Sequence, residues 1–145
     1  MRQNSLPTAL PAAPSLSGGC GAPRALVLII DDHDVVRALV GRTLELGGYD
    51  ILEADGSKGC RQLLAAFVVG LAIVDVQLSD EDGIALMREI RQAQPGLPLL
   101  ATSAMADGVL RERLAEAGLH HRVWTLTKPF TPGELLHTVA RVLAA

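Results

Sequence analysis

A chain of 145 residues with 49% apolar and 20% charged residues is long enough for one globular domain with its own core and too short for two ordinary domains. Its formal net charge of -3 supplies no broad positive field for nucleic acid or an anionic membrane surface, and no apolar run reaches the length of a membrane span. We therefore predict that neither nucleic acid nor a membrane is a direct partner.

The first segment, residues 1–24, is rich in proline, alanine, serine and glycine and has no sustained periodicity, which predicts a disordered leader. Its prolines interrupt every apolar stretch, so the apolar region of a secretory signal peptide is missing. A start extension without function is as good an interpretation as a docking tail. The two cysteines, Cys20 and Cys60, match neither a disulfide framework nor a metal-ligand spacing, which favours a reducing cytoplasm.

From residue 25 onward, short apolar runs alternate five times with longer amphipathic segments. The first, third and fourth runs are almost continuously apolar, as in strands that are buried on both faces of a sheet. The predicted strands are residues 25–30, 49–54, 71–76, 97–103 and 123–127.

Between these runs, apolar residues recur three or four positions apart, which predicts helices with one buried face. The glycine pair at residues 47–48 is expected to end the first helix, and Gly118 to end the fourth. The fifth helix is expected to begin at residues 131–134, which read TPGE, a capping box with proline at the first helical position.

This alternation predicts parallel strands joined by right-handed crossovers, with helices on both faces of the sheet. The predicted fold class is α/β: a (βα)5 doubly wound, flavodoxin-like domain over residues 25–145, with a five-stranded parallel sheet in the order 2-1-3-4-5. Ligands of such sheets lie at the carboxyl ends of the strands, here between the first and third. Because Asp31, Asp32 and Asp75 end those two strands, we expect them to lie together.

Grouped carboxylates repel one another unless a cation or proton lies among them, so the three aspartates indicate a charged site. Asp32 and Asp75, with the backbone carbonyl of Gln77, could supply oxygen ligands to Mg²⁺, and Asp31 could act through water. A carboxylate with a free oxygen can also attack phosphorus and give an acyl phosphate. Capping of the following helix, for which Asp34 is also suited, is the alternative interpretation of the acidic pair.

Attack on a phosphoryl group brings negative charges together and needs cations on the phosphoryl oxygens. Mg²⁺ is expected to provide one and Lys128 the other. The Lys128-Pro129 bond is a candidate cis peptide that would direct the lysine into the pocket. Ser103, at the end of the fourth strand, offers a hydroxyl to a phosphoryl oxygen, although Thr102 beside it is an alternative that strand alternation decides.

Four motifs follow one another along the chain. Residues 27–33 read VLIIDDH, residues 75–83 read DVQLSDEDG, Ser103 precedes an alanine, and residues 128–130 read KPF. Their order and spacing resemble those of the receiver domain of two-component response regulators. In that family, the corresponding motifs are the first strand with its acidic pair, the phosphoacceptor strand, a Ser or Thr before a small residue, and a lysine motif. Each motif alone is weak, whereas the four together are specific.

This resemblance implies that Asp75 accepts a phosphoryl group from a phosphohistidine on a sensor histidine kinase or histidine phosphotransfer protein, with Mg²⁺ as cofactor. Ser103 and Lys128 would then move toward the phosphoryl group and change the contacts with a downstream protein target. We expect a single-domain response regulator that signals by such contacts or by phosphorelay. It would catalyse only its own phosphorylation and dephosphorylation and would not otherwise be an enzyme. The side chains of Gln77 and Met105 are expected to influence the rate at which the phosphoryl group is hydrolysed.

Two departures from the family pattern define the alternatives. Thr125 occupies the position, three residues before the lysine, where the family usually has Tyr or Phe, and Ser79 replaces a common proline. Thr125 motivates a second hypothesis, a receiver-like interaction module that works without phosphorylation. A third, a haloacid-type phosphohydrolase, would need a second aspartate where Gln77 stands. His33 is expected only to border the pocket.

Overall fold

The computed structural model describes residues 24–145, so the leader predicted for residues 1–24 lies outside the described residues except for Arg24. Within the described part, five strands alternate with five helices. The strands are Leu26–Ile30 (β1), Asp50–Ala54 (β2), Leu71–Asp75 (β3), Leu99–Ser103 (β4) and Val123–Thr127 (β5). The helices are Asp34–Leu46 (α1), Ser57–Ala66 (α2), Gly83–Ala93 (α3), Asp107–Glu116 (α4) and Pro132–Ala144 (α5). None of these helices combines the length and the apolar character that crossing a membrane requires.

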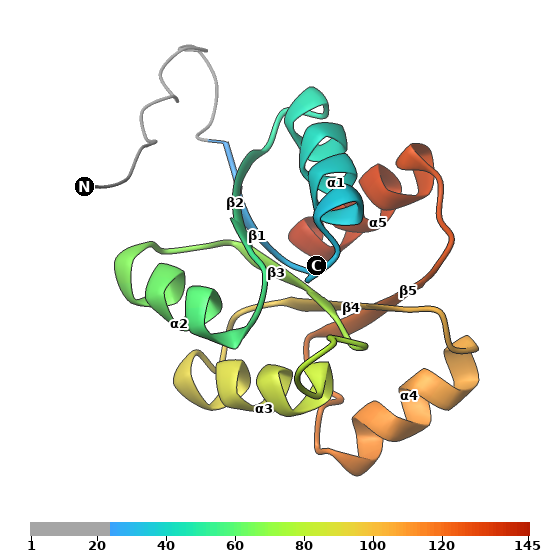
Figure 1. Ribbon diagram of the computed structural model, residues 1–145. Helices are drawn as coiled ribbons and strands as arrows, with labels where there is room; N and C mark the ends of the chain where they lie inside the picture. Colours follow the sequence, from blue (N-terminus) through green and yellow to red (C-terminus); the bar gives the residue numbers. More distant parts are fainter. Residues whose placement is uncertain (1–23) are drawn as a thin grey trace.

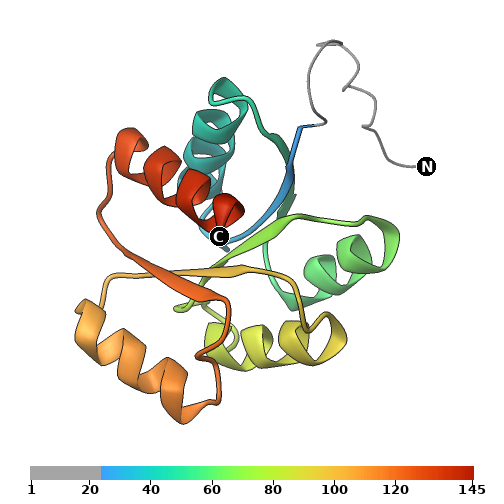
Figure 2. The same ribbon diagram turned by 180° about the vertical axis from the view of Figure 1, so that it is seen from behind.

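All five strands are parallel and form one sheet in the order β2-β1-β3-β4-β5. Helices α1 and α5 cover one face of this sheet, and α2, α3 and α4 cover the other (Figure 1). Figure 2 shows the same two helical layers from behind. The predicted α/β class, strand order and doubly wound arrangement are therefore confirmed. Right-handed crossovers between parallel strands require helices on the faces of the sheet, which is why the alternation in the sequence predicts this architecture.

Observed strand boundaries differ from the predicted ones by at most two residues, and the largest difference is at the start of β4. The N–H of Leu97 donates to the carbonyl of Gln94 (3.2 Å) in a turn, and Pro98 has no N–H to donate to a strand ladder. The strand therefore begins at Leu99, although its apolar pattern begins at residue 97.

Helix ends follow the predicted capping signals. Helix α1 ends before the glycine pair, where Gly48 has a φ of 98°, and α4 ends just before Gly118, which has a φ of 79°. A left-handed backbone at these positions is the reason for glycine. At the start of α5, the Thr131 hydroxyl accepts a hydrogen bond from the N–H of Glu134 (3.0 Å), and the Glu134 carboxylate accepts one from the N–H of Thr131 (2.8 Å).

The core is aliphatic and lies in two layers, one on each side of the sheet. In β1, Val27 and Ile29 pack toward α1 and α5, whereas Leu28 and Ile30 pack toward the other three helices. All four residues are at most 1% exposed, so alternation of side chains buries both faces of the strand. Each such side chain contributes about 1.5–3 kcal/mol of transfer free energy. This burial holds the carboxyl ends of the central strands in place.

Gly83, the first residue of α3, packs directly against the end of β3. A Cβ atom at this position would overlap the carbonyl oxygen of Asp75 and would lie 2.6 Å from the Cα and 2.8 Å from the carbonyl oxygen of Val76. These are backbone atoms of two buried residues, the last residue of β3 and the one after it, and they cannot yield as a flexible side chain can. The absence of a side chain at Gly83 therefore allows α3 to begin beside the end of β3.

Replacing Gly83 with alanine is expected to lower the free energy of unfolding by about 2–3 kcal/mol, because the extra methyl group forces the backbone apart. Urea denaturation followed by circular dichroism measures this loss. Gly108→Ala, in α4, is the matched control, because its Cβ would meet no atom within 4 Å and alanine favours the helix by up to about 1 kcal/mol. A Gly83→Ala protein as stable as the wild type would contradict this account.

Candidate functional site

Three carboxylates meet where β1 and β3 end. β1 and β3 are neighbours in register, with Ile30 opposite Val74, so Asp31, Asp32 and Asp75 emerge at one edge of the sheet. Ligand atoms of these three residues and of His33 all lie within 4.8 Å of one another. The structure thus brings the three aspartates together as the strand order requires.

Each carboxylate accepts one hydrogen bond from a backbone N–H. Oδ1 of Asp31 accepts from the N–H of His33 (2.8 Å), and Oδ1 of Asp75 accepts from the N–H of Gln77 (2.9 Å). Asp31 and Asp75 are 4% and 2% exposed, so their charges lie almost completely inside the protein. Helix α1 begins at Asp34 with His33 as N-cap and without a side-chain cap, so the capping interpretation is not supported.

Asp32 is held by the loop that follows β3. Its Oδ2 accepts a hydrogen bond of 2.6 Å from the N–H of Ser79. Hydrogen bonding from Ser79 is the main cause that holds the pKa of the Asp32 carboxyl below its usual value, and it outweighs the effect of burial. Asp32 is therefore ionised at neutral pH. Ser79, which stands where the family often has proline, has an N–H to donate, which proline lacks.

The other oxygen of Asp32, Oδ1, is buried and has no hydrogen-bond partner within the described residues. Nδ1 of His33 lies 3.2 Å from this oxygen but forms no hydrogen bond with it. A buried carboxylate oxygen without a hydrogen bond is costly, because it has lost its hydration. Carboxylate oxygens are the ligands that hard divalent cations prefer. The cluster could therefore hold a metal ion, which would satisfy this oxygen.

Lys128 supplies the ammonium group of the site. Its Nζ lies 3.3 Å from Oδ2 of Asp75 and 3.4 Å from Oδ2 of Asp31, so one cation bridges the two most buried carboxylates. The backbone N–H of Lys128 donates to the carbonyl of Ser103 (2.8 Å), which ties the residue to the end of β4. The peptide bond between Lys128 and Pro129 is cis, as predicted.

Among the described residues, the side chain of Ser103, and not that of Thr102, forms a hydrogen bond with the loop after β3. The Ser103 hydroxyl donates to Oε1 of Gln77 (3.3 Å) and accepts from the N–H of Met105 (3.0 Å). Ser103 is completely buried at the end of β4. The predicted role of the Gln77 backbone carbonyl as a metal ligand stays a prediction, whereas the Gln77 side chain is engaged with the end of β4.

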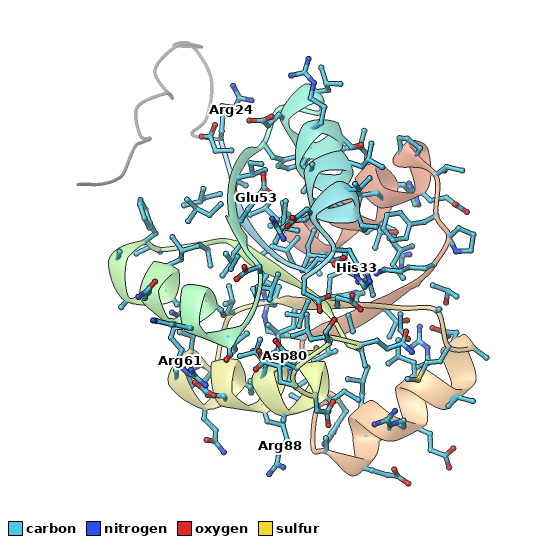
Figure 3. The ribbon with its side chains drawn as sticks, in the orientation of Figure 1. Arg24, His33, Glu53, Arg61, Asp80 and Arg88 are labelled. Carbon is cyan, nitrogen blue, oxygen red and sulfur yellow. The ribbon has the colours of Figure 1, made fainter. Side chains whose placement is uncertain are left out.

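His33 contributes more to the site than the sequence predicts. Its Nδ1 lies 3.3 Å from Oδ1 of Asp31, 3.2 Å from Oδ1 of Asp32 and 4.0 Å from Oδ2 of Asp75. Figure 3 shows it where the chain passes from β1 into α1. Its position directly after two aspartates at a strand end is the signal that could have identified it.

Arg37 is a second residue that sequence reasoning missed. Its guanidinium donates to the backbone carbonyl of Asp31 (2.7 Å), to Asp34 (2.7 Å) and to Glu53 (3.1 Å). These bonds tie the turn after β1 to the neighbouring strand β2. Arg37 thereby fixes the backbone that carries the acidic pair.

Thr125 forms a polar link between β5 and α4. Its hydroxyl donates to Oδ1 of Asp107 (2.6 Å), and Nε of Arg111 donates to Oδ2 of the same carboxylate (2.6 Å). The Thr125 hydroxyl, followed by Arg111, lowers the pKa of Asp107. A hydrogen-bonded link thus occupies the position where the family usually has an aromatic ring.

Comparisons with known proteins agree with this geometry. The family model described as the response regulator receiver domain matches residues 27–140, which is more than half of the chain. Similar curated proteins are the transcriptional regulatory protein GltR of Pseudomonas aeruginosa (34% identity, 81% of this chain, 48% of the relative) and the DNA-binding transcriptional regulator NtrC of Rhizobium meliloti (30% identity, 83% of this chain, 24% of the relative). The chain thus spans about half or less of their length.

Solved structures have the same fold. A CheY-like response regulator receiver domain protein from Methanospirillum hungatei JF-1 superposes with a TM-score of 0.74 at 22% identity, over 83% of this chain and 94% of that chain. A response regulator from Thermotoga maritima gives a TM-score of 0.73 at 24% identity, over 84% of this chain and 99% of that chain. Taken with the family match and the strand order, these findings show that the chain belongs to the response regulator receiver domain family.

Proposed function

We propose that Asp75 accepts a phosphoryl group from a phosphohistidine and that the modified domain signals through altered protein contacts or phosphorelay. The observation that carries this proposal is the placement of a buried carboxylate within 3.3 Å of an ammonium group, Lys128, at the switch point of the sheet. Lys128 balances part of the negative charge that gathers when a carboxylate approaches a phosphoryl group.

The transfer exchanges one bond to phosphorus for another. An oxygen of Asp75 forms the new O–P bond while the N–P bond of the phosphohistidine breaks, and the bonding electron pair returns to the imidazole nitrogen of the donor. Lys128 Nζ and the Ser103 hydroxyl donate to phosphoryl oxygens in the product. The product is an acyl phosphate, which water hydrolyses to restore Asp75 and release inorganic phosphate.

Mg²⁺ is the proposed cofactor. Asp32 and Asp75 would hold it with the backbone carbonyl of Gln77, and Asp31 would act through water. The buried Oδ1 of Asp32, which accepts no hydrogen bond within the described residues, fits this ligand set, as does the ionised state of Asp32. Bound Mg²⁺ would neutralise negative charge on the phosphoryl oxygens during transfer.

Mg²⁺ is expected to stabilise the fold, because a ligand that binds only the native state raises the free energy of unfolding. At a Mg²⁺ concentration about 100 times its Kd, the gain is about 2.7 kcal/mol. Asp32→Asn is expected to lose at least half of this gain. Thermal unfolding with and without Mg²⁺ measures it, and Asp80→Asn, at an exposed carboxylate of the same rim, is the matched control. An equal Mg²⁺ effect in the wild type and in Asp32→Asn would exclude Asp32 as a ligand.

The proposed partners are a sensor histidine kinase or a histidine phosphotransfer protein and a downstream protein target. Receiver domains are signalling modules, so chemistry beyond self-phosphorylation and dephosphorylation is not part of the proposal. Because NtrC is named a DNA-binding regulator, the predicted lack of nucleic-acid binding stays a prediction. A cytoplasmic location, which the buried free thiol of Cys60 suits, belongs to the same proposal.

Incubation with phosphoramidate and Mg²⁺ tests the proposal directly. The wild type is expected to gain the mass of one phosphoryl group, and hydroxylamine, which cleaves acyl phosphates, is expected to remove it. If neither phosphoramidate nor acetyl phosphate gives an adduct, the phosphorylation-independent interaction module, which Thr125 motivates, becomes the better account. Turnover of a small phosphate ester would favour the phosphohydrolase, and we expect none because Gln77 stands where its second aspartate would be.

A further inference from the structure

The Gln77 side chain accepts two hydrogen bonds on a single oxygen. Its Oε1 accepts from the Ser103 hydroxyl (3.3 Å) and from the backbone N–H of Ala104 (3.1 Å). The backbone N–H of Gln77 also donates to Oδ1 of Asp75 (2.9 Å). One residue therefore contacts both the Asp75 carboxylate and the two donors at the end of β4, Ser103 and Ala104.

These two donors lie beside the position that a phosphoryl group on Asp75 would occupy. Asp75 is in register with Thr102 on the neighbouring strand, and Ser103 and Ala104 are the next two residues. An O–H and an N–H that converge on one point form a binding position for an oxygen that carries negative charge. In the unmodified domain, this position is filled by an amide oxygen, which carries only a partial charge.

We propose that the Gln77 carboxamide occupies the phosphoryl-oxygen position of the unmodified domain and must leave it before Asp75 can be phosphorylated. This inference rests on the proposed function. A phosphoryl oxygen carries more negative charge than an amide oxygen, so it competes successfully for the two donors. Gln77 is an exposed residue, so its released side chain moves into water. Gln77 is thus a positioning residue that slows phosphoryl acceptance by keeping Ser103 and Ala104 occupied.

The test variant is Gln77→Met, which keeps the length of the side chain and removes its hydrogen-bond acceptor. Its initial rate of phosphorylation by phosphoramidate with Mg²⁺ is expected to exceed that of the wild type by about threefold to tenfold, the effect of freeing two neutral hydrogen bonds. The rate of adduct loss is measured separately after removal of the donor. Gln92→Met, at an exposed position of α3, is the matched control and should leave the rate unchanged.

A double-variant comparison distinguishes this mechanism from a general effect of methionine at position 77. In a Ser103→Ala background, only the Ala104 donor remains, so the gain from Gln77→Met is expected to fall to about twofold to threefold. A gain that persists in full without the Ser103 hydroxyl would overturn the inference, because the competition would then not involve this donor.

Nuclear magnetic resonance of the unmodified, metal-free protein gives a readout that does not depend on phosphorylation. The amide proton of Ala104 is expected to move upfield and to exchange faster with solvent in Gln77→Met, and to stay unchanged in Gln92→Met. An unmoved Ala104 resonance, or a Gln77→Met rate equal to or below that of the wild type, would overturn the inference. A wild-type protein that forms no adduct would instead refute the proposed function, so the two failures are distinguishable.

Discussion

Asp75→Asn is expected to abolish formation of the phosphoryl adduct. Asparagine has nearly the same shape as aspartate, and its side-chain oxygen can still accept the hydrogen bond that the N–H of Gln77 donates to Oδ1 of Asp75. The variant should therefore keep its fold, but its neutral carboxamide is no nucleophile for phosphorus. Intact-protein mass spectrometry after incubation with phosphoramidate and Mg²⁺ measures the outcome.

Asp80→Asn is the control for this experiment, because it makes the same chemical change at an exposed carboxylate five residues along the chain (Figure 3). It is expected to form the adduct as the wild type does. An adduct of equal yield on Asp75→Asn would place the acceptor on another residue and refute the proposed function. If Asp75→Asn forms no adduct, a pull-down that compares phosphorylated wild type with Asp75→Asn would identify partners that depend on the modification.

Lys128→Met is expected to lower the initial rate of phosphorylation by about 10²–10³-fold, the usual effect of removing one group that stabilises developing negative charge. The Lys128 ammonium lies 3.3 Å from Asp75 and 3.4 Å from Asp31, and methionine has a similar length without the charge. Without the positive charge of Lys128, the buried carboxylates repel the negatively charged phosphoryl group more strongly as it approaches. Quenched time courses with phosphoramidate at saturating Mg²⁺ measure the rate.

Lys58→Met is the matched control, because Lys58 is an exposed lysine on the rim of the site. Circular dichroism of Lys128→Met shows whether the variant keeps its fold, since removal of the cation leaves Asp31 and Asp75 buried without it. A folded Lys128→Met protein with the wild-type rate would mean that Lys128 only balances the charge of the resting site.

The fold could be predicted because its signals are local and repeated. Apolar runs of strand length alternate with helical periodicity. Glycine stands where the backbone after a helix is left-handed, at Gly48 and Gly118, and Thr131 supplies the side-chain cap at the start of α5. Boundaries were less predictable where a turn competes with a strand. Leu97 is apolar and buried, yet its N–H is used in a turn, so the pattern alone could not exclude it from β4.

The grouping of Asp31, Asp32 and Asp75 was also predictable, because residues at the carboxyl ends of neighbouring parallel strands must meet at one edge of the sheet. His33 was underestimated, since its distance from three carboxylates depends on the rotamer it adopts after the strand ends. The contact between Ser79 and Asp32 was not predictable at all, because it joins two loops that are 47 residues apart.

By itself, the sequence determined the architecture, the strand order and the identity of the charged residues, because periodicity, caps and strand-end positions are properties of short segments. Only the tertiary structure decided which donor each carboxylate oxygen receives, that Gln77 occupies the donors of Ser103 and Ala104, and that Thr125 binds Asp107. The N–H groups of His33 and Gln77 lie only two residues from the carboxylates that accept their hydrogen bonds. The physical reason for the rest is that these contacts join residues 18 to 97 positions apart, so they depend on loop paths and rotamers that form only when the whole sheet has packed.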